Sequence, residues 1–225
     1  MPPANNSLFE AIANDGYRIG NCFVLPYDRH RPDIFGSNYL SYLYNQCLLS
    51  APNRPYGIIP ESFCSMQDLS LDAICAYLHT RNPLLLMCMD NPSDPTKFDV
   101  IGFSFPSIWC GGFQSDAVPD PDRSMLMGYV MFRPYYGTPE ANVCMTLTGL
   151  YFFHKFKLVS ISGQSYTFNH LTRKFLAQFG AKDVGVLPRF LNLNGKLVDC
   201  HLTCLLREDF ERHLAASLTI PVPSQ

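Results

Sequence analysis

Residues 132–141 could hold an anion, because they read as a loop that leads into the start of a helix. Thr138 is a favoured helix N-cap, and Pro139 suits the first helical position. The amides and the dipole at such a start favour a negatively charged group such as a phosphate. Arg133 lies in the same segment and could contact a phosphate directly. The same residues also describe an ordinary capped helix, and both interpretations stay open.

A second candidate position is Asn169, which precedes a short amphipathic helix over residues 171–179. Asparagine is a favoured N-cap, and Gly180 is the type of residue that ends a helix. Thr172 follows Asn169 within the first turn of this helix. From the residues alone, Asn169 is predicted to be a structural cap, and a ligand contact from the same side chain is the alternative.

The histidines and cysteines form no pattern that is typical of a nucleophilic triad or a metal site. Cys200, His201 and Cys204 are close in sequence, but they fall on a predicted strand. Successive side chains of a strand point to opposite faces, so His201 points away from the face that Cys200 and Cys204 share. Because zinc needs ligands that converge, no metal site is predicted.

The first half of the chain predicts two helices followed by an antiparallel hairpin. Apolar residues recur at helical spacing over residues 37–49 and 69–79. Residues 84–90 and 98–105 read as strands that a turn joins. Residues 106–123 are predicted to be a long loop, since they include two adjacent glycines and an acidic stretch. Loops of this length are usually functional or mobile.

The second half predicts a strand, a helix and a further strand. The strand over residues 124–132 contains Gly128, and a glycine inside a strand marks a bulge or the close approach of another group. The helix from Pro139 to about Phe156 is apolar nearly all round, so both of its faces should be covered. It connects this strand to the one that begins at Lys157, and such a crossover makes the two strands parallel.

The last predicted elements form a hairpin. Residues 184–187 belong to its first strand, and residues 196–206 form its second. Asn194-Gly195 between these apolar runs is a strong signal for a turn with positive φ. The order of elements therefore predicts an α/β (α+β) domain in which antiparallel and parallel strands share one sheet.

Length and composition exclude several classes of protein. The 225 residues fit a single domain over residues 1–225, with residues 1–7 and 217–225 as flexible ends. A formal net charge of -2 gives no basic footprint for nucleic acid, and no segment suggests a membrane span or a secretion signal. The nine cysteines, an odd number, favour reduced thiols. A cytoplasmic protein that binds neither nucleic acid nor membrane is predicted.

The order of elements over residues 124–210 resembles the GNAT N-acetyltransferase superfamily, and most closely its RimJ/RimL-like branch. The residues that carry the resemblance are Gly128-Tyr129, Asn169, Thr172, Gly180, Leu205-Leu206-Arg207 and Asp209-Phe210. The resemblance implies the GNAT acyl-CoA N-acyltransferase fold, in which a mixed central sheet with splayed parallel strands is flanked by helices.

The resemblance also implies a site for acetyl-coenzyme A (acetyl-CoA). The first splayed strand would bond to the pantetheine arm, and the loop after it would hold the pyrophosphate. The residues assigned to the cofactor in this way are Gly128, Tyr129, Val130, Arg133, Gly137, Thr138 and Asn169. The loop departs from the family, which usually has at least two glycines where this loop has Gly137 alone. Pro139 also removes one amide donor.

At the reaction centre, the resemblance assigns catalytic positions to Asn169 and Thr172. Other positions depart from the family pattern. Ala181 stands where an aromatic residue is usual, and Leu176 stands where many members have a tyrosine that protonates the leaving thiolate. Leu126 replaces a glutamate that is frequent in the RimJ/RimL-like branch.

The function that the resemblance implies is direct transfer of an acetyl group from acetyl-CoA to an amine of a protein N-terminus, a lysine or a small molecule. The amine must be neutral to react, so a carboxylate should lie in the acceptor cleft. The candidates are Glu61, Asp99, Asp120 and Asp122. A monomer or a homodimer is expected. The alternative is a non-catalytic GNAT-like binding or assembly module with a degenerate cofactor site, which Leu126, Leu176 and the single loop glycine favour.

Overall fold

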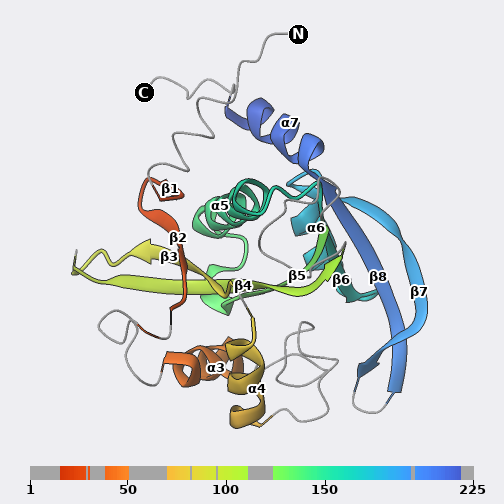
Figure 1. Cartoon of the computed structure of the whole chain (residues 1–225), viewed down its shortest axis with the longest axis horizontal. Coiled ribbons are helices and arrows are strands. Elements are labelled where there is room, and N and C mark those ends of the chain that lie inside the picture. Colours follow the sequence, from red (N-terminus) through yellow and green to blue (C-terminus); the bar gives the residue numbers. More distant parts are fainter. Residues whose placement is uncertain are drawn as a thin grey trace.

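A computed structural model describes residues 16–28, 30, 39–50, 70–81, 83–94, 96–110, 124–193 and 196–218. They form an 8-stranded sheet in the order β1-β2-β3-β4-β5-β6-β8-β7 (Figure 1). The strands are β1 (Arg18–Ile19), β2 (Cys22–Pro26), β3 (Leu85–Asp90), β4 (Phe98–Cys110), β5 (Ser124–Met131), β6 (Ser160–Tyr166), β7 (Lys182–Leu193) and β8 (Lys196–Leu206). The sheet is mixed, because β5 and β6 are parallel whereas the other neighbours are antiparallel.

Helices cover both faces of the sheet (Figure 1). They are α3 (Tyr39–Ser50), α4 (Leu71–His79), α5 (Pro139–Lys155), α6 (His170–Ala177) and α7 (Arg207–Leu218), with a short 3-10 helix η2 (Arg133–Tyr135). α3 and α4 lie on one face and α5 on the other. α6 and α7 pack on the side of α5, since Phe175, Phe179 and Phe210 join the core beneath it. In the described ranges, no helix combines the length and the apolar character that a membrane span requires.

Strand β3 shows how the sheet is buried on both faces. Leu85 and Met87 belong to the core beneath α5, whereas Leu84, Leu86 and Cys88 belong to the core that α3 and α4 cover. Because successive side chains of a strand alternate between faces, one continuous apolar run supplies two buried layers.

Helix α5 is buried nearly all round, as its sequence predicted. Thr138 is its N-cap, and Pro139 lies in its first turn. One side of α5 packs on the sheet, and another receives α7, where the ring of Phe210 lies 5.3 Å from that of Phe153. A Cβ at Gly149 would meet the Phe210 ring at 2.9 Å, so the glycine permits this close approach of α7.

Strands β5 and β6 confirm the parallel crossover that the sequence predicted. Their paired residues are Ser124 with Ser160, Met125 with Ile161, and Leu126 with Ser162. β5 continues to Met131 and β6 to Tyr166, but the described register has no β5–β6 pairs beyond these. The two strands therefore pair at one end and separate at the other, which is the predicted splay.

The structure corrects the end of β4. Residues 106–110, which were expected to begin a long loop, continue the strand and pair with β5. Pro106 lacks an N–H and suggested a strand end, but β3 pairs with β4 only as far as Ser104. A proline is tolerated at such an open edge. The guanidinium of Arg81 donates to the Ser107 carbonyl at 2.7 Å, beyond the end of β3. Residues 111–123, the rest of the predicted loop, lie outside the described residues.

Other boundaries also differ from the prediction. β1, β2 and α7 were not predicted, and β6 begins at Ser160 rather than at Lys157. α7 extends past residue 217, into the range expected to be a flexible end. β8 has the predicted bounds. The predicted turn at Asn194-Gly195 lies outside the described residues.

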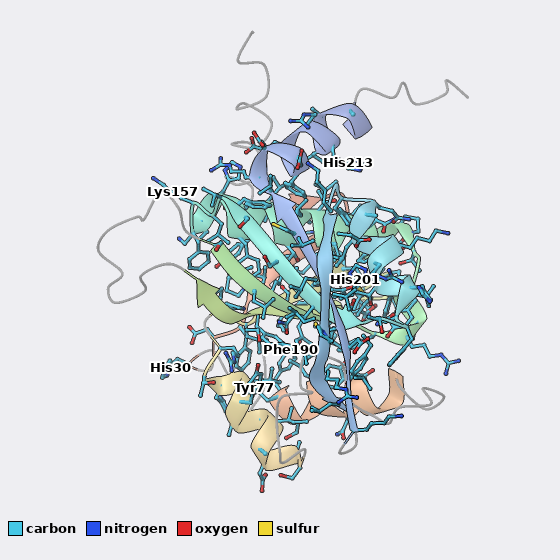
Figure 2. All side chains as sticks on the ribbon, turned by 90° about the vertical axis from the view of Figure 1, so that its right-hand side faces the viewer. His30, Tyr77, Lys157, Phe190, His201 and His213 are labelled. Atoms are coloured by element: carbon cyan, nitrogen blue, oxygen red, sulfur yellow. The ribbon has the colours of Figure 1, made fainter. Side chains whose placement is uncertain are left out.

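The alternation predicted for Cys200 and His201 on β8 is confirmed; Figure 2 labels His201 on the β7–β8 hairpin. Cys200 packs with Tyr166 in a small buried cluster. His201 lies on the other face, with its Nδ1 3.6 Å from a carboxylate oxygen of Asp183. Within the described ranges, no group of at least three His, Cys, Asp or Glu residues is placed to hold a metal ion.

Candidate functional site

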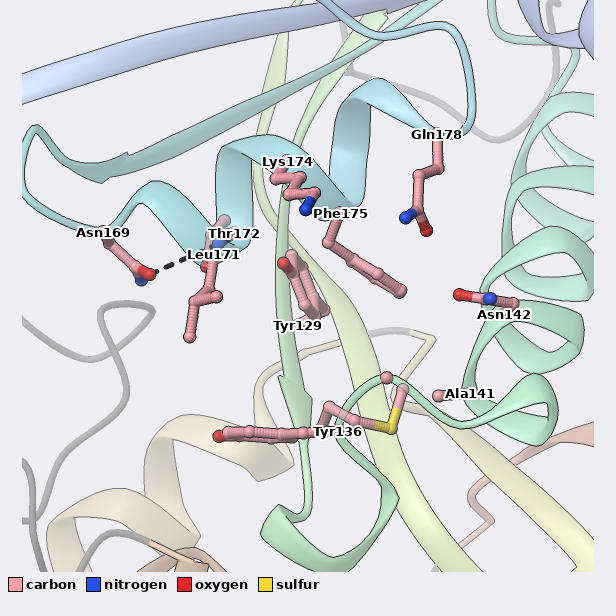
Figure 3. Close-up of a pocket in the computed structure, with 12 residues that line it drawn as sticks. Tyr129, Tyr136, Ala141, Asn142, Asn169, Leu171, Thr172, Lys174, Phe175 and Gln178 are labelled. Atoms are coloured by element: carbon pink, nitrogen blue, oxygen red, sulfur yellow. Dashed lines mark hydrogen bonds between the residues drawn. The ribbon is translucent and has the colours of Figure 1, made fainter.

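A pocket of ≈ 350 Å³, called the larger pocket, lies beside the point where β5 and β6 separate. Three elements line it: the end of β5, the loop and first turn of α5, and α6 (Figure 3). Its lining residues are Tyr129, Met131, Tyr136, Gly137, Ala141, Asn142, Asn169, Leu171, Thr172, Lys174, Phe175 and Gln178. The pocket therefore combines apolar walls with amide, hydroxyl and ammonium groups, a lining that suits a ligand of mixed polarity.

Asn169 is the N-cap of α6 and also lines the larger pocket. Its side-chain oxygen accepts a hydrogen bond from the Thr172 amide at 3.3 Å (Figure 3). The structural interpretation of Asn169 is thus confirmed. Because the same side chain also lines the pocket, a ligand in the pocket could contact Asn169 while the cap is formed.

The opposite wall is the start of α5, where the sequence also predicted a cap. The Thr138 hydroxyl accepts from the Ala141 amide at 3.2 Å and donates to the Tyr135 carbonyl at 3.1 Å. These bonds fix the turn that carries Gly137 into the pocket wall. The two walls therefore come from two capped helix starts that lie far apart in the sequence.

The structure brings together some of the residues assigned to the site and leaves others aside. Tyr129, Gly137, Asn169 and Thr172 line the larger pocket. Gly128, Val130, Arg133 and Thr138 are not among its lining residues.

Gly128 and Val130 belong to the opposite face of β5. Val130 packs in the core that α3 and α4 cover, whereas Tyr129 packs with the core beneath α5. A Cβ at Gly128 would meet the ring of Phe105 on β4 at 2.6 Å. The register at Gly128 is regular, and the nearby bulge falls between Pro106 and Ile108. The glycine is therefore explained by an aromatic ring that packs against the strand.

Sequence reasoning missed three polar residues of the pocket, Asn142, Lys174 and Gln178. Lys174 and Gln178 are one helical turn apart, so their common face could be read from the predicted helix. Asn142 lies in the first turns of α5, close to the predicted cap. What the sequence did not show is that these two faces meet across one pocket.

A smaller pocket of ≈ 30 Å³ lies nearer the paired ends of β5 and β6. Tyr129 borders both pockets, and its ring lies 6.2 Å from that of Phe175. Leu176 lines the smaller pocket. Leu126 is in the last β5–β6 pair, opposite Ser162. The two positions at which the resemblance expects an acid and a base thus carry aliphatic side chains at the splay.

The candidate general bases gain no support from the described residues. Asp99 lies on β4 and accepts a hydrogen bond from the Asn91 side chain at 3.1 Å. It lines neither pocket. Glu61, Asp120 and Asp122 lie outside the described residues.

Burial controls the ionisation of three thiols in the two cores of the protein. It raises the pKa of the Cys22, Cys88 and Cys144 thiols, so they stay protonated at neutral pH. A protonated, buried thiol is a poor nucleophile. The free thiols are those of Cys22, Cys75, Cys88, Cys144, Cys200 and Cys204. These three buried thiols therefore offer no covalent acceptor for an acyl group.

No protein-family model matches the sequence, and no curated protein matches it. Solved structures share its architecture. RimJ from Mycobacterium smegmatis, in complex with CoA-disulfide, has a TM-score of 0.59 at 17% identity, over 87% of this chain and 88% of its own. Spermidine N-acetyltransferase from Vibrio cholerae, in complex with CoA and spermine, has a TM-score of 0.58 at 12% identity, over 84% and 98%. Ribosomal-protein-S5-alanine acetyltransferase from Vibrio fischeri has a TM-score of 0.53 at 18% identity, over 86% and 97%.

These likenesses show that the chain has the GNAT acyltransferase fold, as the sequence predicted. At these identities the likeness is one of fold. Membership of the RimJ/RimL-like branch stays a prediction, and the activity has to be argued from the site.

Proposed function

We propose that this chain is an acetyl-CoA-dependent N-acetyltransferase of the RimJ/RimL-like branch. The observation that carries the proposal is the larger pocket, which opens where two parallel strands of a GNAT fold separate and which two capped helix starts border. Two solved structures with this fold are complexes, RimJ with CoA-disulfide and spermidine N-acetyltransferase with CoA and spermine. The acceptor is an amine, on a protein N-terminus, a lysine or a small molecule, and the protein acts in the cytoplasm as a monomer or homodimer.

Within this proposal, each wall of the larger pocket has a separate task. Tyr129 and the end of β5 lie against the pantetheine arm, and Gly137 approaches the phosphates. Asn169 contacts the arm through its side-chain amide, and Thr172 lies near the thioester. Gly128, Val130, Arg133 and Thr138 do not line the pocket, so no direct contact with the cofactor is assigned to them.

The proposed reaction is direct transfer. Acetyl-CoA supplies an activated acyl carbon, a neutral amine forms the new N–C bond, and the C–S bond breaks so that coenzyme A leaves as a thiol with the proton that the amine loses. The buried, protonated thiols of Cys88 and Cys144 give no support to an acyl-enzyme. Leu126 and Leu176 offer no proton acceptor or donor at the splay, so binding and orientation must supply most of the rate enhancement.

A second candidate function is a non-catalytic module that binds CoA or a related ligand. The aliphatic side chains of Leu126 and Leu176 at the splay favour it. Incubation with acetyl-CoA and a panel of amines, including spermidine and a peptide that begins with alanine, separates the two functions. Release of free coenzyme A thiol with any acceptor supports the enzyme. CoA binding without thiol release supports the module.

Acetyl-CoA is expected to raise the melting temperature of the purified chain. A ligand that binds only the folded state stabilises it by RT ln(1 + [L]/Kd), which is about 2.7 kcal/mol at a hundredfold excess over Kd. Differential scanning fluorimetry with increasing acetyl-CoA, and with adenosine as the control, measures the shift. An unchanged melting temperature at millimolar acetyl-CoA would count against both the enzyme and the CoA-binding module.

Replacement of Asn169 by alanine is expected to have two effects. Loss of the cap should lower the free energy of unfolding by about 1 kcal/mol. Loss of the pocket-facing side chain should also weaken CoA binding in protein that remains folded. Ser70→Ala removes the N-cap of α4, a helix that does not line the pocket, so it serves as the matched control. If both variants bind CoA equally well, Asn169 is a cap alone.

A further inference from the structure

We infer that the diphosphate of coenzyme A is held mainly by the ammonium group of Lys174 on α6, with the side-chain amides of Asn142 and Gln178, rather than by the loop before α5. The inference rests on the proposed function, because it takes a CoA-type ligand as the occupant of the larger pocket. The diphosphate would then be bound by α6, the helix that has Asn169 as its N-cap and Thr172 in its first turn.

The backbone amides of the loop are largely used within the protein. Four of the amides between residues 136 and 142 donate to acceptors in the same segment or in η2, namely those of Tyr136, Thr138, Ala141 and Asn142. Pro139 has no N–H. Among the described residues, acceptors are absent only for the amides of Gly137 and Glu140 in this stretch. The loop therefore offers two neutral donors.

Two neutral donors would leave most oxygen atoms of a diphosphate without a hydrogen-bond partner. The group carries negative charge on oxygens that each accept several hydrogen bonds, and a charged donor makes roughly twice as strong a bond as a neutral one. Loops that hold phosphate without a cation use several consecutive amides. This loop, with one glycine and a proline at the helix start, lacks such a run, so a positively charged side chain is required.

Lys174 is the residue that supplies this charge. Of the described residues that line the larger pocket, it is the one with a charged side chain. In Figure 3, Gln178 extends from α6 toward Asn142 on α5, and Lys174 lies on the same helix above Tyr129 and Phe175. An ammonium and two amides thus border one pocket from both helices, and amide N–H groups add neutral donors to the charged one.

Arg133 occupies a different place. It begins η2, at the far end of the loop from the start of α5, and it is exposed. It does not line the larger pocket. Arg133, the cation that the sequence suggested for the phosphate, therefore lies outside the pocket wall. Lys174 forms part of that wall.

Calorimetric titration of the purified chain with CoA, dephospho-CoA and pantetheine tests the inference. Dephospho-CoA keeps the diphosphate without the 3′-phosphate, and pantetheine has neither. Lys174→Gln is expected to weaken the binding of CoA and dephospho-CoA by about 10- to 100-fold, the usual effect of losing a charged hydrogen bond. Its pantetheine binding should match that of the wild type, and Lys174→Arg should recover part of the loss.

Two further variants are matched controls for the charge. Lys196→Gln removes an exposed lysine of β8 that lines neither pocket, and Arg133→Gln removes the cation of the loop. Both are expected to change CoA affinity by less than about threefold. Melting temperatures without ligand should agree among all variants, because the three substituted side chains are exposed.

The outcomes separate this inference from the function beneath it. Unchanged CoA affinity in Lys174→Gln, or a loss as large in Arg133→Gln, would overturn the inference while the wild type still binds CoA. If Lys174→Gln lost affinity for CoA but not for dephospho-CoA, Lys174 would contact the 3′-phosphate, and its assignment to the diphosphate would be wrong. A wild-type chain that binds none of the three ligands would remove the proposed function together with the inference.

Discussion

Replacement of Phe210 by alanine is expected to lower the free energy of unfolding by about 3–5 kcal/mol. Phe210 is 2% exposed, and its ring lies 5.3 Å from that of Phe153. It fills the space that Gly149 leaves open on α5. Alanine would leave a cavity between α5 and α7 that the two helices can close only in part. Denaturant unfolding followed by circular dichroism measures the loss.

Phe190→Ala is the matched control for this change. It removes the same atoms from β7, where the side chain is 53% exposed (Figure 2). Surface substitutions of this kind are usually within about 0.5 kcal/mol of the wild type. If the two variants unfolded at the same denaturant concentration, α7 would not be packed on α5 as the structure shows.

Elements with capped ends could be predicted well from the sequence. Thr138-Pro139 fixes the start of α5, and Asn169 fixes the start of α6, because a cap depends on residues within one turn. The parallel pairing of β5 with β6 followed from the length of the crossover that joins them. Local signals of this kind need no knowledge of the rest of the fold.

Elements that depend on their neighbours could not be predicted in the same way. Pro106 suggested a loop, but β4 continues to Cys110. Its pairing with β3 stops at Ser104, whereas its pairing with β5 extends to Cys110. α7 is mostly polar, and its Phe210 and Leu214 belong to the core beneath α5. β1 is too short to show an alternating pattern. In each case the decisive partner lies far away in the sequence.

The candidate site shows the same division. Tyr129, Gly137, Asn169 and Thr172 were assigned by resemblance, and all four line the larger pocket. Lys174 was missed, since a lysine on the face of a short helix usually reads as a solvated residue. Its position in the pocket wall depends on how α6 lies against α5, which neither helix specifies by itself.

Gly128→Ala is expected to lower the free energy of unfolding by about 1–3 kcal/mol, with little change in CoA affinity of the protein that remains folded. The added Cβ would lie 2.6 Å from the Phe105 ring, inside any normal contact distance. That ring belongs to the core covered by α3 and α4. The larger pocket lies on the other side of β5, where Tyr129 and Met131 line it. Denaturant unfolding and calorimetric titration of the same variant measure the two quantities.

Phe105→Leu supplies the control for Gly128→Ala, because leucine lacks the ring atoms that the new Cβ would meet. Each single change is expected to be destabilising, and the double variant should lose less stability than the sum of the two. A positive coupling of this kind assigns Gly128 to packing between β4 and β5. If the losses of stability were additive and CoA binding were weakened in folded Gly128→Ala protein, Gly128 would instead contact the cofactor, as the resemblance implied.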